Sequence, residues 1–548
     1  MTDVLIVGAG PTGLTLACDL ARRGVAVRIV DRSPEHPRSS RSKGPNARSL
    51  EVLEDLGVVE AVLAAGSPPL PMRKYRDGVP VADTDPYAGS SPTPDAPYDR
   101  GRLIAQWRLE EILRDRLAGY GVAVETGTEV VGLTDDGSSV TVTLADGSTA
   151  GARYVVGCDG AHSRVRKLLG VPFDGETDEE QLMVCGDVEI TPGVLDRGIW
   201  HQWFDEDGAV MLCPVPGTRT GWWFQSGPER DADGRPLAPS PDGFRRLFAR
   251  HTRLPAGSIT GATLLSTYRV NVRMADRYRV GRVLLAGDAA HVHAIAGGLG
   301  MNTGIQDAFN LGWKLDRTLR GRGGPGLLDT YEEERLPVAA WTLALTSERL
   351  RATLEAIREP GGGLDTAITP STAGLDRGYR WSSLARLGNG SGNGGGNGDG
   401  DEDGVRSGDR APDAPCAEAA TGAPTRLFRV FAGPHITVLG FGAGTERTLR
   451  EAAGTHGDAV RTFRVYDAGE PGPGTAAPDA LHDRDGLARA AYGVDGDTVV
   501  VIRPDNHVAL IADARDRDAV RRCLDALDGV REPDPMSVAS MVDGTRKG

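Results

Sequence analysis

The chain lacks an excess of positive charge, a long apolar run and a basic leader. Its 62 lysine and arginine residues are outnumbered by 76 aspartate and glutamate residues, which gives a net charge of −14. An acidic balance argues against nucleic acid and against an anionic membrane surface as partners. No apolar run reaches the roughly 18 residues that a membrane helix needs. The first residues, MTDVLIVGAG, enter a strand directly and do not resemble a signal peptide. We therefore expect a cytoplasmic protein.

Paired cysteines are also missing. None of the six cysteines forms a CxxC pair, so the sequence predicts neither a zinc site nor any other metal site, and no disulfide framework. Their scatter fits a reducing compartment. They are Cys18, Cys158, Cys185, Cys213, Cys416 and Cys523.

Glycine, in contrast, is abundant, with 74 residues of 548. The stretch GNGSGNGGGNGDGDEDG, residues 388–404, has no apolar side chain and is typical of a flexible linker. It separates the chain into an N-terminal part and a compact C-terminal domain. The expected parts are a discontinuous nucleotide-binding domain (1–180 and 269–385), a mostly antiparallel sheet (181–268), the linker (386–410) and the C-terminal domain (411–548).

The first motif, GAGPTG, follows a predicted strand over 3–7 and begins a predicted helix. Gly8 allows a tight turn, Gly10 lets the backbone approach a pyrophosphate, and Gly13 lets helix and strand pack closely. The N-terminus of the helix offers free N–H groups to the phosphate. A lone GxGxxG would also fit a helix-packing turn. Asp31, however, closes the next strand, where a carboxylate accepts ribose hydroxyls. The glycine turn and Asp31 together favour a dinucleotide cofactor, but they do not distinguish FAD from NAD.

Two further aspartates end predicted strands, Asp159 in VVGCDGAHSRVR and Asp288 in LLAGDAAH. Each alone could be a turn former. Together with GAGPTG they suggest one extended cofactor that returns to the same sheet. The stretch GGLGMNTG, starting at Gly297, leads into another predicted helix over 305–315 and forms a second candidate anion site.

In this order, the motifs resemble those of the single-component flavoprotein aromatic hydroxylases of the para-hydroxybenzoate hydroxylase type. The resemblance covers residues 1 to about 350, and the added C-terminal part is similar to that of the phenol hydroxylase-like branch, which includes actinobacterial hydroxylases of aromatic polyketides. It implies an α/β fold with a Rossmann-like FAD-binding domain, an inserted substrate-binding sheet and a thioredoxin-like C-terminal domain. That last domain lacks CxxC, so we expect structural or dimer support there and no redox role.

The resemblance implies one FAD, reduced by NADH or NADPH, whose C4a-hydroperoxide hydroxylates a polycyclic, polyketide-type aromatic in natural-product tailoring. Baeyer–Villiger or epoxidising oxygenation on the same scaffold stays open, as does antibiotic-inactivating hydroxylation. A non-enzymatic FAD-binding scaffold is the remaining alternative. A monomer or a homodimer is expected.

The resemblance also implies cofactor contacts at individual positions. The adenosine half would be held through Gly8, Gly10, Thr12, Gly13, Asp31, Arg32 and Val130. The flavin half would be held through Arg41, Gln106, Asp159, Asp288, Gly298, Met301 and Asn302, with Asp159 also associated with nicotinamide.

No catalytic residue follows from the sequence. His291 and His293 lie near the expected flavin, but a general base requires demonstrated reach, so a structural or solvent-facing role is favoured for both. The sequence leaves two roles open for the aromatic side chains of the predicted sheet. They line a pocket for a flat substrate, or they pack in the core of the sheet. They are Trp203, Trp222 and Phe224, with Trp200, Phe204 and Trp223.

One position departs from the family pattern. The family usually has proline in H-x-P-x-G-G, and this chain has Ile295. Proline fixes φ and offers no N–H, whereas isoleucine restores a donor and loosens φ. The departure predicts altered flavin mobility or an altered oxygenation outcome.

Overall fold

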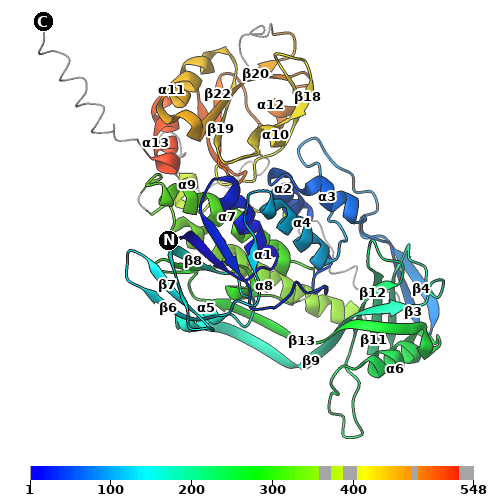
Figure 1. Cartoon of the computed structure of the whole chain (residues 1–548). Helices are drawn as coiled ribbons and strands as arrows, with labels where there is room; N and C mark the ends of the chain where they lie inside the picture. The colour runs from blue at the N-terminus through cyan, green and yellow to red at the C-terminus, as the bar shows by residue number, and fades with distance from the viewer. Residues whose placement is uncertain are drawn as a thin grey trace, which may run out of the picture. The chain divides into compact units, whose positions relative to one another are not determined.

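A computed structural model describes residues 2–206, 208–294, 297–324, 326–356, 372–386, 404–470 and 479–529. The chain divides into two compact units (Figure 1). Unit 1 comprises Met1–Thr93, Tyr98–Asn310 and Arg335–Leu375. Unit 2 comprises Pro94–Pro97, Leu311–Glu334 and Asp376–Gly548.

The first sheet of unit 1 has the strand order β14-β15-β8-β1-β2-β5, and β7 joins β6 to β8. Strands β15, β8, β1, β2 and β5 are parallel, so their carboxyl ends lie along one edge, which we call the cofactor edge. The predicted strand, glycine turn, helix and strand unit is confirmed. The strands are β1 (Thr2–Val7), β2 (Val27–Val30), β5 (Val124–Glu125), β6 (Val130–Asp135), β7 (Val140–Leu144), β8 (Thr149–Gly157), β14 (Arg279–Val280) and β15 (Val283–Leu285).

Local sequence explains where the helices of unit 1 begin. Gly10 precedes α1 and Pro11 occupies its first turn, where a missing N–H costs nothing. The side chain of Asn46 accepts a hydrogen bond from Ser49 N at 3.0 Å and caps α2. The helices are α1 (Pro11–Arg22), α2 (Ala47–Asp55), α3 (Val59–Ala65), α4 (Gln106–Ala118), α5 (Arg164–Leu168) and α6 (Pro241–Thr252), with the 3-10 turns η1 (Ala256–Ser258) and η2 (Gly287–Ala289).

The second sheet of unit 1 has the order β16-β13-β9-β12-β11-β10-β3-β4 and is antiparallel except between β10 and β3. It corrects the expected limits of 181–268. The long strands β9 and β13 begin and end outside that range, and the segment 72–84 supplies edge strands. The strands are β3 (Met72–Arg76), β4 (Val79–Thr84), β9 (Phe173–Ile190), β10 (Trp200–Asp205), β11 (Gly208–Pro214), β12 (Gly221–Ser226), β13 (Ile259–Ala275) and β16 (His291–Val292).

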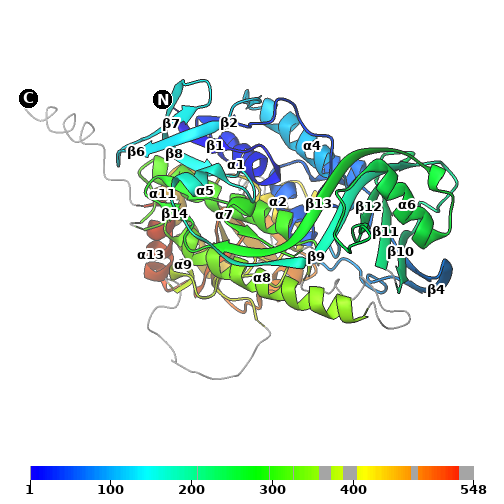
Figure 2. The ribbon, with the colours of Figure 1, turned by 90° about the horizontal axis from the view of Figure 1, so that it is seen from below.

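Helix α6 covers one face of this second sheet (Figure 2). Gly186 makes room for it, because a Cβ there would lie 2.2 Å from a ring carbon of Phe244. Directly opposite residues of antiparallel strands share a face. Phe224 opposes Gly186 and therefore faces α6, whereas the neighbouring pair Trp223 and Asp187 lies on the other face, which we call the face opposite α6.

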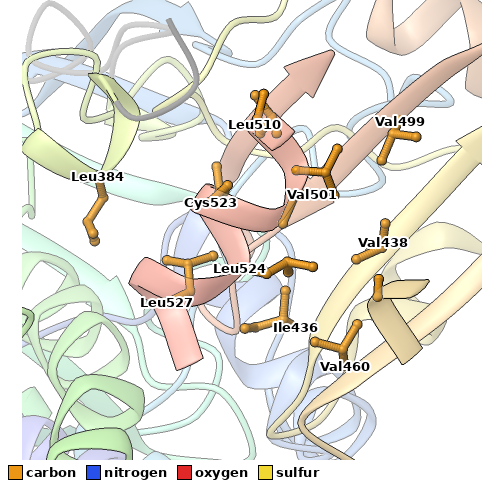
Figure 3. Close-up of a cluster of buried hydrophobic side chains, with 14 of the residues drawn as sticks. Leu384, Ile436, Val438, Val460, Val499, Val501, Leu510, Cys523, Leu524 and Leu527 are labelled. Carbon is orange, nitrogen blue, oxygen red and sulfur yellow. The ribbon is translucent and has the colours of Figure 1, made fainter. Parts of the chain in front are cut away.

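Unit 2 contains a mixed sheet with the order β18-β17-β21-β20-β19-β22-β23. Two hydrophobic clusters use alternate residues of its strands, one of them under α13 (Figure 3). A thioredoxin-like assignment stays a prediction. The elements are α9 (Ser383–Arg386), β17 (Pro415–Glu418), β18 (Pro424–Arg426), α10 (Leu427–Phe431), β19 (Ile436–Phe441), η5 (Ala443–Thr445), α11 (Glu446–His456), η6 (Gly457–Ala459), β20 (Val460–Asp467), β21 (Ala480–Asp483), α12 (Leu487–Tyr492), β22 (Thr498–Ile502), β23 (Val508–Asp513) and α13 (Arg517–Asp528).

Two helices cross from one unit into the other, which corrects the expected domain 269–385. Helix α7 (Gly300–Leu319) enters unit 2 at Leu311, and α8 (Thr330–Ala356) leaves it after Glu334. Hydrophobic packing and an ion pair explain why the end of α7 and the start of α8 belong to unit 2. Trp313 lies in the core of unit 2, and Lys314 pairs with Glu334 at 2.6 Å.

The end of the predicted linker also belongs to unit 2. Gly408 N donates to Val508 O at 2.7 Å, and Arg410 donates to Asp95 O at 2.7 Å. Residues 404–410 therefore belong to unit 2, before the expected domain start at residue 411. Residues 387–403 of the predicted linker lie outside the described residues.

All six cysteines are free thiols. Burial raises the pKa of Cys416 and of Cys523 to about 12. Within the described ranges, no group of histidine, cysteine, aspartate and glutamate side chains is arranged to hold a metal ion. Among the described helices, none combines the length and the apolar character needed to cross a membrane.

Candidate cofactor site

The first glycine turn packs against two neighbouring strand ends at the cofactor edge. Gly8 has φ +104°, and a Cβ there would lie 2.4 Å from Cys158 O, beyond the end of β8. A Cβ on Gly13 would lie 2.0 Å from Gly8 O. Gly8 N also donates to Val30 O of β2 at 2.8 Å. These contacts explain why Gly8 and Gly13 have to be glycine.

Thr12 brings the second glycine-rich stretch against the first. A Cβ on Gly287, in η2, would lie 2.5 Å from Thr12 Oγ1. A Cβ on Gly304, in α7, would lie 2.3 Å from the same oxygen. The start of α1, the turn after β15 and the start of α7 therefore meet at the cofactor edge. This arrangement is the one that a single extended cofactor requires.

Three positions at this edge face open space. No described atom lies within 4 Å of a Cβ built on Gly10 or on Gly298. The side chain of Asp288 is accessible, yet burial among protein atoms raises its pKa, with His291 and Arg41 opposing the rise. The exposed carboxylate of Asp288 is therefore available to a ligand at this edge. Glycine backbone, an available carboxylate and an open space at parallel strand ends fit the binding of FAD.

Two backbone N–H groups fix the carboxylate of Asp31 at the end of β2. Its Oδ2 accepts from Ala9 N at 2.8 Å, and its Oδ1 accepts from Ser33 N at 2.8 Å. A carboxylate has about four acceptor positions, so two remain for ribose hydroxyls. Arg32 beside it is exposed, whereas Val130 is buried at the start of β6.

Gln106 fixes the segment that carries Arg41. Its Oε1 accepts from Ser42 N at 3.1 Å, and its Nε2 donates to Glu110 at 2.9 Å. Arg41 itself is exposed. The side chain of Gln106 therefore positions this segment, and flavin contacts by Gln106 and Arg41 stay a prediction.

Asp159 caps the short helix α5. Its carboxylate accepts from Ser163 Oγ at 2.6 Å and from the backbone N of Arg164 and Val165 at 2.6 and 3.1 Å. The turn-forming alternative therefore accounts for Asp159 without a ligand. A contact of this residue with FAD or nicotinamide is still only a prediction.

Asn302 fixes the second glycine turn from within α7. Its Oδ1 accepts from Asn46 N at 2.8 Å, and its Nδ2 donates to Gly298 O at 2.8 Å. The first-turn N–H groups of Gly300, Met301 and Asn302 have no acceptor inside the helix, so they suit an anion or a negative ring. Ile295 lies outside the described residues, and the hypothesis about it stays a prediction.

A buried network that the sequence did not reveal holds the two histidines. His291 Nε2 lies 2.7 Å from Asp307 Oδ2, and His291 Nδ1 lies 2.8 Å from His293 Nε2. Asp307 also accepts from Gly287 N at 3.0 Å and from Arg335 Nε at 2.7 Å. The carboxylate places a proton on His291 Nε2. A structural role therefore explains His291. Asp307 and Arg335 gave no signal in the sequence, because 27 residues separate them along the chain.

The three aromatic residues predicted to line the substrate pocket lie in the core of the second sheet, under α6. Trp203, Trp222 and Phe224 belong to the cluster that packs under α6, and their exposed fractions are 1, 2 and 0 %. Core packing, the alternative that the sequence left open, accounts for all three. Trp200 and Trp223 instead lie with Cys213 on the face opposite α6.

The parallel strands that form the cofactor edge and the second, mostly antiparallel sheet together define a FAD-dependent enzyme. The family model for the FAD binding domain matches residues 1–346, and the chain belongs to this family. It is a flavoprotein monooxygenase.

Individual relatives agree with this assignment. The chain is 36 % identical over 529 residues to a flavin-dependent monooxygenase of Mycobacteroides abscessus, which covers 93 % of this chain and 97 % of the relative. It is 37 % identical over 366 residues to a rifampicin monooxygenase of Streptomyces venezuelae, over 64 % of this chain and 71 % of the relative. The ternary complex of aklavinone-11 hydroxylase with FAD and aklavinone matches with a TM-score of 0.77 at 27 % identity, over 96 and 99 % of the two chains.

Proposed function

We propose that the protein hydroxylates a polycyclic, polyketide-type aromatic, with O2 as the oxygen donor and NAD(P)H as the reductant. The observation that carries this proposal is the face opposite α6. There, the half-buried indole of Trp200 and the buried indole of Trp223, which packs with Leu103 and Ala105, lie on the same face of the sheet as the polar groups of Asp187 and Gln225. Flat apolar walls with a few polar groups are typical of sites for aromatic ligands. The structure of aklavinone-11 hydroxylase with aklavinone supports this substrate class.

The chain contributes binding, orientation and the exclusion of water. When bound, FAD supplies the redox chemistry that activates O2. Gly10 and the start of α1 would hold its phosphates, and Asp31 its ribose. The first-turn N–H groups of α7 would stabilise negative charge on its ring. Trp200 and Trp223 would keep water away from the reacting carbon.

We propose a cytoplasmic enzyme that is a monomer or a homodimer, with a place in natural-product tailoring. The contacts with FAD assigned to Arg32, Arg41, Val130, Met301 and Gly298 belong to the same proposal.

The purified protein is expected to be yellow, and a polycyclic phenol should stimulate NAD(P)H oxidation with matching O2 uptake. The measurement is a panel of hydroxylated anthraquinones, naphthacenes and rifamycins, with product masses. A gain of one oxygen with intact rings supports hydroxylation, whereas ring opening indicates Baeyer–Villiger chemistry. A rifamycin as the only productive substrate would favour antibiotic inactivation. Bound flavin without stimulated turnover on any member would favour the scaffold alternative.

A further inference from the structure

Several buried polar atoms on the face opposite α6 have no partner among the described residues. They are Asp187 Oδ1, Trp200 Nε1 and Trp223 Nε1. Buried polar side-chain atoms nearly always have a hydrogen-bond partner in folded proteins, and exceptions call for an explanation. One acceptor and two donors on one face of one sheet suit a ligand that carries both donors and acceptors.

Lys43 lies on the same face and brings a positive charge to it. Its Nζ donates to Gln225 Oε1 at 3.1 Å and lies 5.4 Å from the ring centroid of Trp200. The centroid of Trp223 is 6.0 Å away. An ammonium group has three donors, and Gln225 uses one. In the part of the chain that the structure describes, no carboxylate forms an ion pair with Lys43.

The surroundings of Lys43 leave its charge incompletely compensated. Burial lowers the pKa of the Lys43 ammonium, while Cys213, Cys185 and Asp187 oppose that shift. Burial raises the pKa of Asp187 to about 6, although Ser40 N at 2.9 Å and Lys43 act against the rise. Lys43 is half-buried, and a cation partly withdrawn from water without a contacting anion is unfavourable. An anionic group of a ligand would supply the missing partner.

We propose that Lys43, Asp187 and Gln225 form a subsite for the ionised phenolic oxygen of an aromatic ligand. The oxyanion accepts from Lys43 Nζ, Asp187 Oδ1 accepts from a neighbouring hydroxyl of the ligand, and the indoles of Trp200 and Trp223 line the rings. The subsite selects hydroxyquinones and acidic phenols over neutral aromatics of the same shape. This inference rests on the proposed function, because it assigns the substrate to the face opposite α6.

The test uses the FAD-loaded protein and the dye 1,2-dihydroxyanthraquinone, which changes colour when its acidic hydroxyl ionises. The wild-type protein is expected to bind the coloured anion at a pH where the free dye is neutral, and to lower the apparent pKa of the dye by one or more. Lys43→Met should remove the colour shift and weaken dye binding about 10-fold or more. Lys43→Arg should retain the shift, because it keeps the charge.

Matched controls distinguish the loss of the charge of Lys43 from damage to the fold. Lys167 is an exposed lysine of unit 1, and Lys167→Met should leave the shift unchanged. Unsubstituted 9,10-anthraquinone should bind wild type and Lys43→Met within about three-fold of each other. Flavin absorbance shows that each variant keeps its cofactor.

The results distinguish the subsite from the proposed function. A wild-type protein that binds the dye only in its neutral form, or a Lys43→Met variant with the full shift, would overturn the subsite even if turnover is observed. A shift that depends on Lys43 would support it even if no member of the substrate panel is oxygenated, and the absence of turnover would then count against hydroxylation alone.

Discussion

Replacing Gly10 with valine is expected to remove FAD binding and to leave the protein folded. No described atom lies within 4 Å of a Cβ at Gly10, and its φ of −77° is open to any residue. The new side chain would therefore occupy only the space that the pyrophosphate needs. We expect FAD affinity to fall by about 100-fold or more, which is the effect of ~3 kcal/mol of overpacking. Flavin fluorescence titration of the apoprotein measures the change, and circular dichroism checks the fold.

Two other glycines make this prediction specific. Gly257 also has open space around its Cβ position, but it lies in η1 at the second sheet, so Gly257→Val should bind FAD like wild type. Gly13→Ala should instead damage the fold, because its Cβ would lie 2.0 Å from Gly8 O. Normal FAD affinity in Gly10→Val would place the pyrophosphate elsewhere and remove the proposed cofactor site.

Replacing Asp307 with asparagine is expected to destabilise the protein by about 3–5 kcal/mol, the usual effect of removing one partner of a buried ion pair. Asp307 is fully buried and accepts from Gly287 N, His291 and Arg335. Asparagine has nearly the same shape but cannot compensate the guanidinium of Arg335, which is 1 % exposed. Urea unfolding at neutral pH measures the loss.

The pH dependence gives a second readout for Asp307. Burial by itself would raise the pKa of Asp307, but Arg335 and His291 hold it well below its ordinary value of 3.8. A depressed pKa in the folded state stabilises the protein above the pKa of the unfolded state, and this stabilisation disappears as the pH falls through the folded pKa. The difference between wild type and Asp307→Asn should therefore be constant above about pH 5 and shrink below about pH 4.

An exposed aspartate is the control for this pair of measurements. Asp276 lies on the surface and pairs with Arg277 at 2.9 Å, and Asp276→Asn should change the free energy of unfolding by less than about 0.5 kcal/mol. An Asp307→Asn variant as stable as wild type would show that the network does not hold the cofactor edge together.

The cofactor edge was the most predictable part of the molecule. GAGPTG, Asp31, Asp288 and the second glycine turn are local signals, because a tight turn or a strand end leaves its mark in a few consecutive residues. The parallel strand order then brings them together. The roles of Asn302 and Asp159 could not be read in the same way, since their side-chain partners depend on tertiary packing.

The second sheet shows why the proposed ligand surface, the face opposite α6, was less predictable. Successive side chains of a strand point to opposite faces of the sheet, and the sequence contains no signal for which of the two faces α6 covers. Trp222 and Trp223 are neighbours in the chain, yet one packs under α6 and the other lies opposite it. Lys43 is remote in sequence from every strand that surrounds it, so only the fold reveals its place beside Gln225.

Helix α7 limits how this enzyme can be divided. It begins at the second glycine turn, and its last residues complete the interior of unit 2, where Arg317 contacts Asp528 at 2.6 Å. Arg503 likewise forms hydrogen bonds to Glu334, in the first turns of α8, at 2.6 and 2.8 Å. A chain shortened at residue 386 would thus keep buried charges whose counterparts have been cut away. The C-terminal unit is for this reason a poor candidate for exchange between homologous enzymes, and chimeras are better joined within surface turns of unit 1, such as that between β6 and β7.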